Sequence, residues 1–128
     1  MMGWDKDISL TTRGEFHRDK DRFVISYITY NENFKENDST KVEIDSNRKV
    51  IFTREGKYGT HIIIEMGRKN FTHLETDEGD VMIGIRANSI SNKLDDNGGS
   101  LSLSYSLDIN STELYQSSLE ITVKELGG

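Results

Sequence analysis

A stretch of ten strictly alternating polar and apolar residues constrains the fold of this chain more than any other feature. From Ser100 to Ile109 the sequence reads Ser-Leu-Ser-Leu-Ser-Tyr-Ser-Leu-Asp-Ile. Successive side chains of a β-strand point to opposite faces of the sheet, so the leucines share one face and the serines share the other. A helix would scatter both sets around its axis. The pattern therefore predicts an antiparallel sheet with one buried and one solvated face.

Glycine and Asn/Asp clusters separate about nine strand-like runs along the rest of the chain. The expected strands cover residues 7–13, 22–30, 41–45, 49–54, 60–66, 71–76, 81–92, 100–109 and 119–125. Gly14 is expected to end the first strand, and Gly84 to bend or bulge the seventh. Asn47 is expected to supply the positive φ of a hairpin turn, and residues 112–115 to form one helical turn.

The order of these strands predicts an all-β fold. Short sequential connections favour an antiparallel up-and-down meander, and eight or nine such strands satisfy their edges best by closing into a β-barrel. A two-sheet sandwich is the alternative. The chain has 128 residues, with 34% hydrophobic and 30% charged. This length fits a single domain over residues 1–128, because a sheet with one wet face needs few apolar residues.

Charge and composition exclude several classes of protein. The net charge of −6 argues against a nucleic-acid partner and against a protein held on an anionic membrane. The absence of cysteine excludes disulfides and thiolate metal sites. The first seven residues lack the apolar core of a secretory signal, and no run is long enough to cross a bilayer. A cytoplasmic location is therefore expected.

No arrangement of residues in the sequence predicts catalysis, a metal or a cofactor. His61 and His73 flank a predicted hairpin turn at residues 67–70, and pairing of residues 66 and 71 would place them on different faces. A bulge would reverse that parity and bring them together with Glu65. His17 lies in a charged segment. The paired carboxylates lie on predicted turns, where acidic residues commonly bind the local backbone. We therefore expect no enzyme.

The interior of the predicted barrel remains as a candidate site. A closed eight-stranded barrel either packs solid or encloses one small ligand. Polar side chains that turn inward would then select the ligand, and the alternative is that they face solvent. The candidate ligand-binding residues are Arg54, Thr72, Thr76, Arg86 and Tyr105.

A second hypothesis is a protein-interaction module with a solid core. The strand from Phe23 to Tyr30 is apolar on both faces, and the polar loop of residues 31–40 carries Phe34. Exposed apolar residues there would form an interface, with a homodimer as one form of it.

From Lys41 onward the chain also carries residues whose order and spacing resemble a known family. The matching residues are Val42-Glu43-Ile44, Val50 to Gly56, Thr60, Ile62 to Glu65, Gly67, Thr72, Thr76, Gly79 and Tyr105 to Ile109. They are similar to the YwiB-like family of small bacterial proteins of unknown function. The resemblance implies a lipocalin-like (calycin-type) β-barrel and implies no assigned reaction. Trp4 lacks the Gly-x-Trp context of the lipocalin signature, so lipid transport is not implied.

Overall fold

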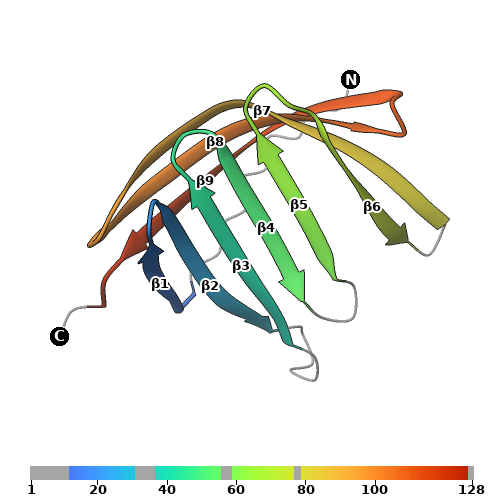
Figure 1. Ribbon diagram of the computed structural model, residues 1–128. Helices are drawn as coiled ribbons and strands as arrows, with labels where there is room; N and C mark the ends of the chain where they lie inside the picture. The colour runs from blue at the N-terminus through green and yellow to red at the C-terminus, as the bar shows by residue number, and fades with distance from the viewer. Residues whose placement is uncertain (1–11, 31–36, 56–58, 77–78, 127–128) are drawn as a thin grey trace.

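The structure is a computed structural model that describes residues 12–30, 37–55, 59–76 and 79–126. Nine antiparallel strands in the described residues form two sheets (Figure 1). The five-stranded sheet contains β1 (Gly14–Asp19), β2 (Arg22–Tyr30), β3 (Asn37–Asp45), β4 (Lys49–Glu55) and β5 (Thr60–Glu65). The four-stranded sheet contains β6 (Asn70–Thr76), β7 (Gly79–Asp95), β8 (Gly98–Ile109) and β9 (Glu113–Lys124).

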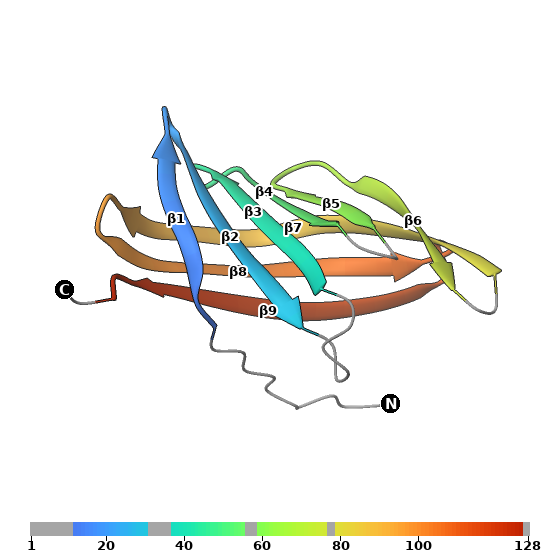
Figure 2. The ribbon, with the colours of Figure 1, turned by 90° about the horizontal axis from the view of Figure 1, so that it is seen from below.

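The predicted all-β meander is confirmed, but the predicted closed barrel is not. Each strand pairs with its neighbour in sequence except at the step from β5 to β6, where the ladder breaks and the chain changes sheets. The two sheets lie face to face, and their strands cross at a steep angle (Figures 1 and 2). Within the described residues, the arrangement is thus closer to the sandwich alternative.

The segment that joins the two sheets differs from the predicted hairpin around Gly67. Residues 66 and 71 do not pair; Glu65 forms an isolated bridge with Arg68, and Met66 forms one with Ala87 of β7. Met66 also donates its backbone N–H to the carbonyl of Arg48. Gly67 has a φ of 74°, which favours glycine at this corner. The prediction of a turn was right, and the prediction of its partner strands was wrong.

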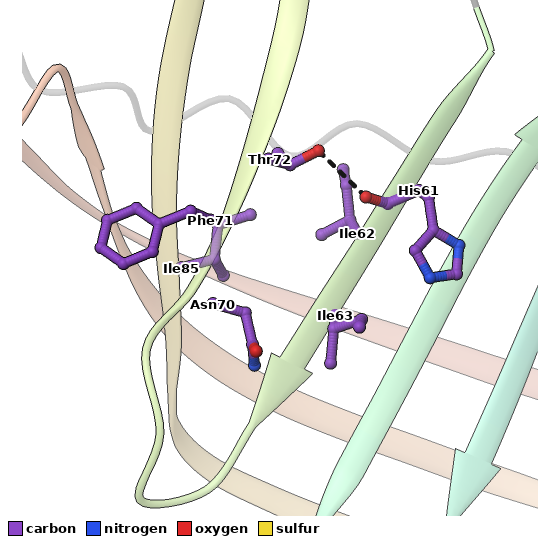
Figure 3. Close-up of a pocket in the computed structure, with 7 residues that line it drawn as sticks. All are labelled: His61, Ile62, Ile63, Asn70, Phe71, Thr72 and Ile85. Carbon is purple, nitrogen blue, oxygen red and sulfur yellow. Dashed lines mark hydrogen bonds between the residues drawn. The ribbon is translucent and has the colours of Figure 1, made fainter.

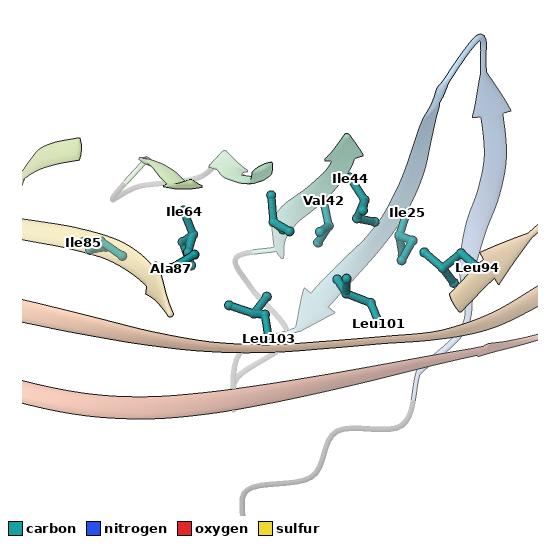
Figure 4. Packing of buried hydrophobic residues seen from close by; sticks show 10 residues of the cluster. Ile25, Val42, Ile44, Ile64, Ile85, Ala87, Leu94, Leu101 and Leu103 are labelled. Carbon is teal, nitrogen blue, oxygen red and sulfur yellow. The ribbon is translucent and has the colours of Figure 1, made fainter. Parts of the chain in front are cut away.

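The core lies between the inner faces of the two sheets. In Figure 4, Leu101 and Leu103 of β8 point toward Val42 and Ile44 of β3. The side chains of Val42, Ile44, Val50 and Leu101 are fully buried. Buried side chains of both sheets therefore meet in the middle of the molecule, and the apolar residues of β8 face the core as predicted.

The predicted irregularity of β7 lies at Asn88 instead of Gly84. The β7–β8 register shifts between Ala87 and Ser89, whereas Gly84 pairs regularly with Phe71 and Asp108. The extra residue reverses the alternation, so the inward positions change from odd numbers before it to even numbers after it. Both halves of the 17-residue strand thus present apolar side chains to the core.

Three other expectations need correction. The predicted first strand lies almost wholly outside the described residues, and Gly14 begins β1 instead of ending a strand. Residues 112–115 form no helical turn, because β9 begins at Glu113. In the β3–β4 turn the positive φ belongs to Ser46, at 46°, and not to Asn47.

Candidate functional site

The inner face of the five-stranded sheet carries one polar row at the end where β2 connects to β3. Cross-strand pairing brings together Tyr27, Thr40, Arg54 and Thr60, which we call the end row. Thr40 lies two residues before the inward Val42, and Arg54 lies two residues after the inward Phe52, so the row is on the inner face. The end row lies directly beyond the apolar core.

Thr40 is the one polar side chain of the end row that is fully enclosed. It is 4% exposed, and its Oγ1 is a buried side-chain atom without a hydrogen-bond partner. Such atoms are rare in folded proteins, because an unpaired buried hydroxyl costs about 1–3 kcal/mol. Thr40 is therefore an unsatisfied donor and acceptor that faces the space between the sheets.

Arg54 lies beside Thr40 in the same row. Its side chain is exposed and forms no ion pair with any residue that the structure describes. A guanidinium presents several N–H donors in a plane that matches a carboxylate or phosphate. The register position of Arg54, two residues from Phe52, lies on the inner face, which is one of the two orientations that the sequence left open.

The four other predicted site residues do not join this row. Tyr105 of β8 packs against the core from the opposite sheet, on the inner face. Arg86 of β7 is exposed on the outer face, between the inward Ile85 and Ala87, so the expectation that it turns inward is wrong. Thr76 ends β6, and its side chain lies outside the described part of the structure.

Thr72 instead links β6 to β5 by a hydrogen bond. Its Oγ1 donates a hydrogen bond of 3.0 Å to the backbone carbonyl of His61, as Figure 3 shows. A small pocket opens beside this bond and has a volume of about 70 Å³. Its lining residues are His61, Ile62, Ile63, Asn70, Phe71, Thr72 and Ile85. Ligand pockets span about 300–1,000 Å³, so this one holds a few water molecules at most.

His61 and His73 do not lie on the same face of one sheet. His61 lies on the outer face of β5, where its Nδ1 is 3.1 Å from the hydroxyl of Thr53. Its ring points away from β6 (Figure 3), and His73 is exposed on the other sheet. No group of three His, Cys, Asp or Glu residues with metal-binding geometry occurs among the described residues.

A half-buried ion pair on the outer face of the four-stranded sheet was not predicted from the sequence. Asp108 was grouped with the solvated serines of β8, yet it is only 8% exposed. Its carboxylate pairs with Nζ of Lys69, which reaches over from the β5–β6 connection. Gly84 makes room for the pair, because a Cβ there would lie 2.5 Å from Cε of Lys69. The glycine in an otherwise apolar strand was the available signal.

A second ion-pair cluster lies on the outer face of the five-stranded sheet. Glu43 accepts from Arg22 at 2.8 Å and lies 3.2 Å from Nζ of Lys41. Burial raises the pKa of Glu43, but the hydrogen bonds and charges of Lys41 and Arg22 outweigh it and lower the pKa below its ordinary value. The cluster joins β2 to β3.

These observations define a two-sheet antiparallel β fold with a hydrophobic core and a polar row at one end of the space between its sheets. The chain matches a family described as a domain of unknown function, DUF1934, over residues 2–121, and it belongs to that family. No curated protein and no solved structure matches the chain. The described residues contain no helix that could cross a membrane.

Proposed function

We propose that this protein is a non-enzymatic binder of a small, partly apolar molecule that carries an anionic group. The observation that carries the proposal is the buried, unpartnered hydroxyl of Thr40 beside the guanidinium of Arg54, which forms no ion pair with the residues that the structure describes. A ligand oxygen at this position would satisfy both groups. The buried hydroxyl then has a reason to be retained in place of a methyl group.

The position of the end row limits the size of the ligand. Val42, Ile44 and Val50 are fully buried in the centre of the molecule, so we place the ligand at the end row, where the polar side chains begin. Tyr27 belongs to this row and packs against the core, and it offers aromatic surface for an apolar segment of the ligand. A short amphiphile with a carboxylate or phosphate head fits these contacts.

Two finer expectations belong to the same proposal. The meander order of the strands supports a lipocalin-like (calycin-type) relationship, since such folds place ligands between facing strands near one mouth. A cytoplasmic location fits the net charge of −6. The YwiB-like resemblance stays a prediction beside the family assignment.

The test begins with native and denaturing mass spectrometry of the freshly purified full chain. An excess mass that disappears on denaturation would indicate a co-purified ligand. Calorimetric titrations with octanoate and with octanol would then compare a charged head with a neutral one. We expect octanoate to bind at least about tenfold more tightly, because only octanoate pairs with a cation.

A matched pair of variants assigns that binding to the end row. Arg54→Met should weaken octanoate binding by about tenfold or more, whereas Arg86→Met should leave it unchanged, because Arg86 lies on the outer face. A bare native mass together with no octanoate binding would overturn the proposal. Equal octanoate affinity of Arg54→Met and the wild type would show that the ligand does not bind at the end row.

A further inference from the structure

The connection between β5 and β6 brings basic residues together at one corner of the molecule. The first residue of this connection, Met66, bridges to Ala87 of β7. The first residue of β6, Asn70, pairs with Ile85 of the same strand. The connection therefore lies along β7 at residues 85–87, and the residues that it carries are close to the residue of β7 between these two contacts.

Three arginines at this corner have no counter-ion among the residues that the structure describes. Arg86 is the residue of β7 between the two contacts, and Arg68 lies within the connection. The backbone carbonyl of Arg48, in the β3–β4 turn, accepts the N–H of Met66. All three arginine side chains are exposed, and none of them forms a described ion pair. Their guanidinium groups can therefore bind carboxylates or phosphates from outside the molecule.

The carboxylates of Asp108 and Glu65, which also lie at the corner, already have partners. Asp108 pairs with Lys69 on the outer face of the four-stranded sheet. Glu65 accepts a hydrogen bond of 3.3 Å from the side-chain amide of Asn70. Two carboxylates do not balance the three arginines together with Lys69. The corner therefore has an excess of positive charge, although the net charge of the whole chain is −6.

Apolar side chains continue this surface on the outer face of the four-stranded sheet. Phe71, which pairs with Gly84, is 56% exposed, and Met82 is 39% exposed. Met82 and Arg86 lie two residues before and after Gly84, so they share its face. Nζ of Lys69 lies 5.5 Å from the centre of the Phe71 ring, and this ring points away from the pocket residues of β5 (Figure 3). We give the name corner patch to Arg48, Arg68, Lys69, Phe71, Met82 and Arg86.

We propose that the corner patch binds a short acidic peptide segment of a partner protein. The carboxylates of the segment would pair with the arginines, and its apolar side chains would cover Phe71 and Met82. Arginine, methionine and aromatic residues are the side chains enriched at protein interfaces. The pocket beside the patch has a volume of about 70 Å³, which is too small to enclose an organic ligand.

The charge of the rest of the molecule favours a short segment over other anionic partners. A nucleic acid or an anionic membrane would extend beyond the corner patch and meet a surface that carries the net negative charge of the chain. A short acidic segment stays within the patch and avoids most of this repulsion, because charges separated by more than about 10 Å are screened at 0.1 M salt.

Titration of the isotope-labelled full chain with a synthetic peptide tests this proposal. The probe is a twelve-residue peptide of alternating glutamate and leucine, and the amide chemical shifts of the protein report where it binds. We expect the largest shifts at the amides of Arg68, Lys69, Phe71 and Arg86. The absence of shifts at about 1 mM peptide, or shifts confined to other strands, would overturn the proposal.

A matched pair of double variants assigns the binding to the arginines. Arg68→Gln with Arg86→Gln should weaken peptide binding at least about tenfold, because both charges leave the patch. Arg13→Gln with Lys93→Gln removes the same charge from exposed positions outside the patch, and it should change the affinity less than about twofold. Circular dichroism checks that each double variant is folded. An equal loss of affinity in the two double variants would overturn the proposal, because it would show only a general attraction to positive charge.

Two further probes test the class of the partner. A peptide of alternating glutamate and serine should bind at least about fivefold more weakly, because it has no apolar side chains to cover Phe71 and Met82. A single-stranded RNA of twelve nucleotides should cause no shifts at the corner patch. RNA that binds there as tightly as the glutamate and leucine peptide would overturn the choice of a protein partner. Equal affinity of the two peptides would overturn the apolar contacts.

This proposal does not depend on ligand binding at the end row, and either can fail alone. Octanoate at the end row should respond to Arg54→Met and not to Arg86→Met. The peptide at the corner patch should respond to the loss of Arg86 and not to Arg54→Met, because Arg54 lies on the inner face of the other sheet.

Discussion

At the scale of single residues, the buried hydroxyl of Thr40 lowers the stability of the ligand-free protein and is proposed to bind the ligand. It is 4% exposed and lacks a partner, so it weakens the ligand-free protein. Thr40→Val keeps the shape and removes the unpaired group. We expect this variant to raise the free energy of unfolding by about 1 kcal/mol in urea titrations while it weakens octanoate binding.

The control for this substitution is Thr122→Val, at an exposed position on β9, which should change stability by less than about 0.5 kcal/mol. A Thr40→Val protein that is less stable than the wild type would show that the hydroxyl has a partner. It would also remove the main support for the end row as a binding site.

The Lys69–Asp108 pair is a second feature of this scale. Lys69→Met would leave the carboxylate of Asp108, which is 8% exposed, without its cation. We expect a loss of about 1–2 kcal/mol in the free energy of unfolding, because Lys69 is part-exposed and water partly screens the pair. The double variant Lys69→Met with Asp108→Asn should recover part of that loss. A double variant that is less stable than Lys69→Met alone would contradict this account.

At the scale of strands, the extra residue Asn88 keeps β7 in phase with the core. Deleting it would turn Ile90 and Leu94 outward, or would force the same reversal on Ile85 and Ala87. We expect the deletion to cost more than about 3 kcal/mol or to prevent folding, because several buried side chains move into water. Thermal denaturation measures this loss. Asn88→Ser keeps the bulge and should stay within about 1 kcal/mol of the wild type.

The same strand shows how much of the fold the sequence could predict. The alternation of Ser100 to Ile109 predicted β8 and its buried face, because periodicity is local information. The change of phase between Ala87 and Ile90 is also visible in the sequence, but the glycine at position 84 predicted the irregularity at the wrong residue. Gly84 instead gives space to Lys69, which lies far enough along the chain that no local pattern connects them.

The change from one sheet to the other between β5 and β6 could not be predicted from local sequence patterns. Residues 60–66 and 71–76 have the sequence of a hairpin, yet Met66 bridges to Ala87 and the chain changes sheets. Packing between the two sheets determines where the chain changes sheets, and that packing depends on contacts between residues distant in sequence. For the candidate site, the sequence offered Arg54 and left its orientation open, whereas Thr40 was missed because burial of a hydroxyl depends on the opposite sheet.

The Glu43 cluster belongs to the scale of strands, since it joins β2 to β3 from the outside. The folded-state pKa of Glu43 is lowered, so its contribution is complete above the ordinary carboxyl pKa of about 4.3. It is lost as the pH falls through the lower, folded-state pKa. We expect the free energy of unfolding to fall below about pH 4.3, and Glu43→Gln to reduce that fall by about 0.2–1 kcal/mol. An identical pH profile for Glu43→Gln would exclude the pair as a contributor.

At the scale of the whole molecule, the two sheets are held together at one end by a side-chain clamp. The backbone N–H of Asn92 on β7 donates to Oδ1 of Asn47 at 2.9 Å, and its side-chain amide donates to the carbonyl of Ser46 at 3.1 Å. The β3–β4 turn is thereby tied to the opposite sheet. The end row lies at the other end of the same strands, where the hydrogen bond from Thr72 of β6 to the carbonyl of His61 ties the sheets at the β5 edge and no bond from a β-turn is described.

This asymmetry predicts where the molecule opens. Asn47→Ala removes the acceptor for Asn92 N–H and should lower the free energy of unfolding by about 0.5–1.5 kcal/mol. Because both sheets share one core, urea unfolding should remain a single transition that intrinsic fluorescence and circular dichroism follow alike. Hydrogen exchange should protect the amides around Val42 and Leu101 most strongly and those around Arg54 less. Two separate transitions, or faster exchange at Val42 than at Arg54, would show that the sheets do not fold as one unit.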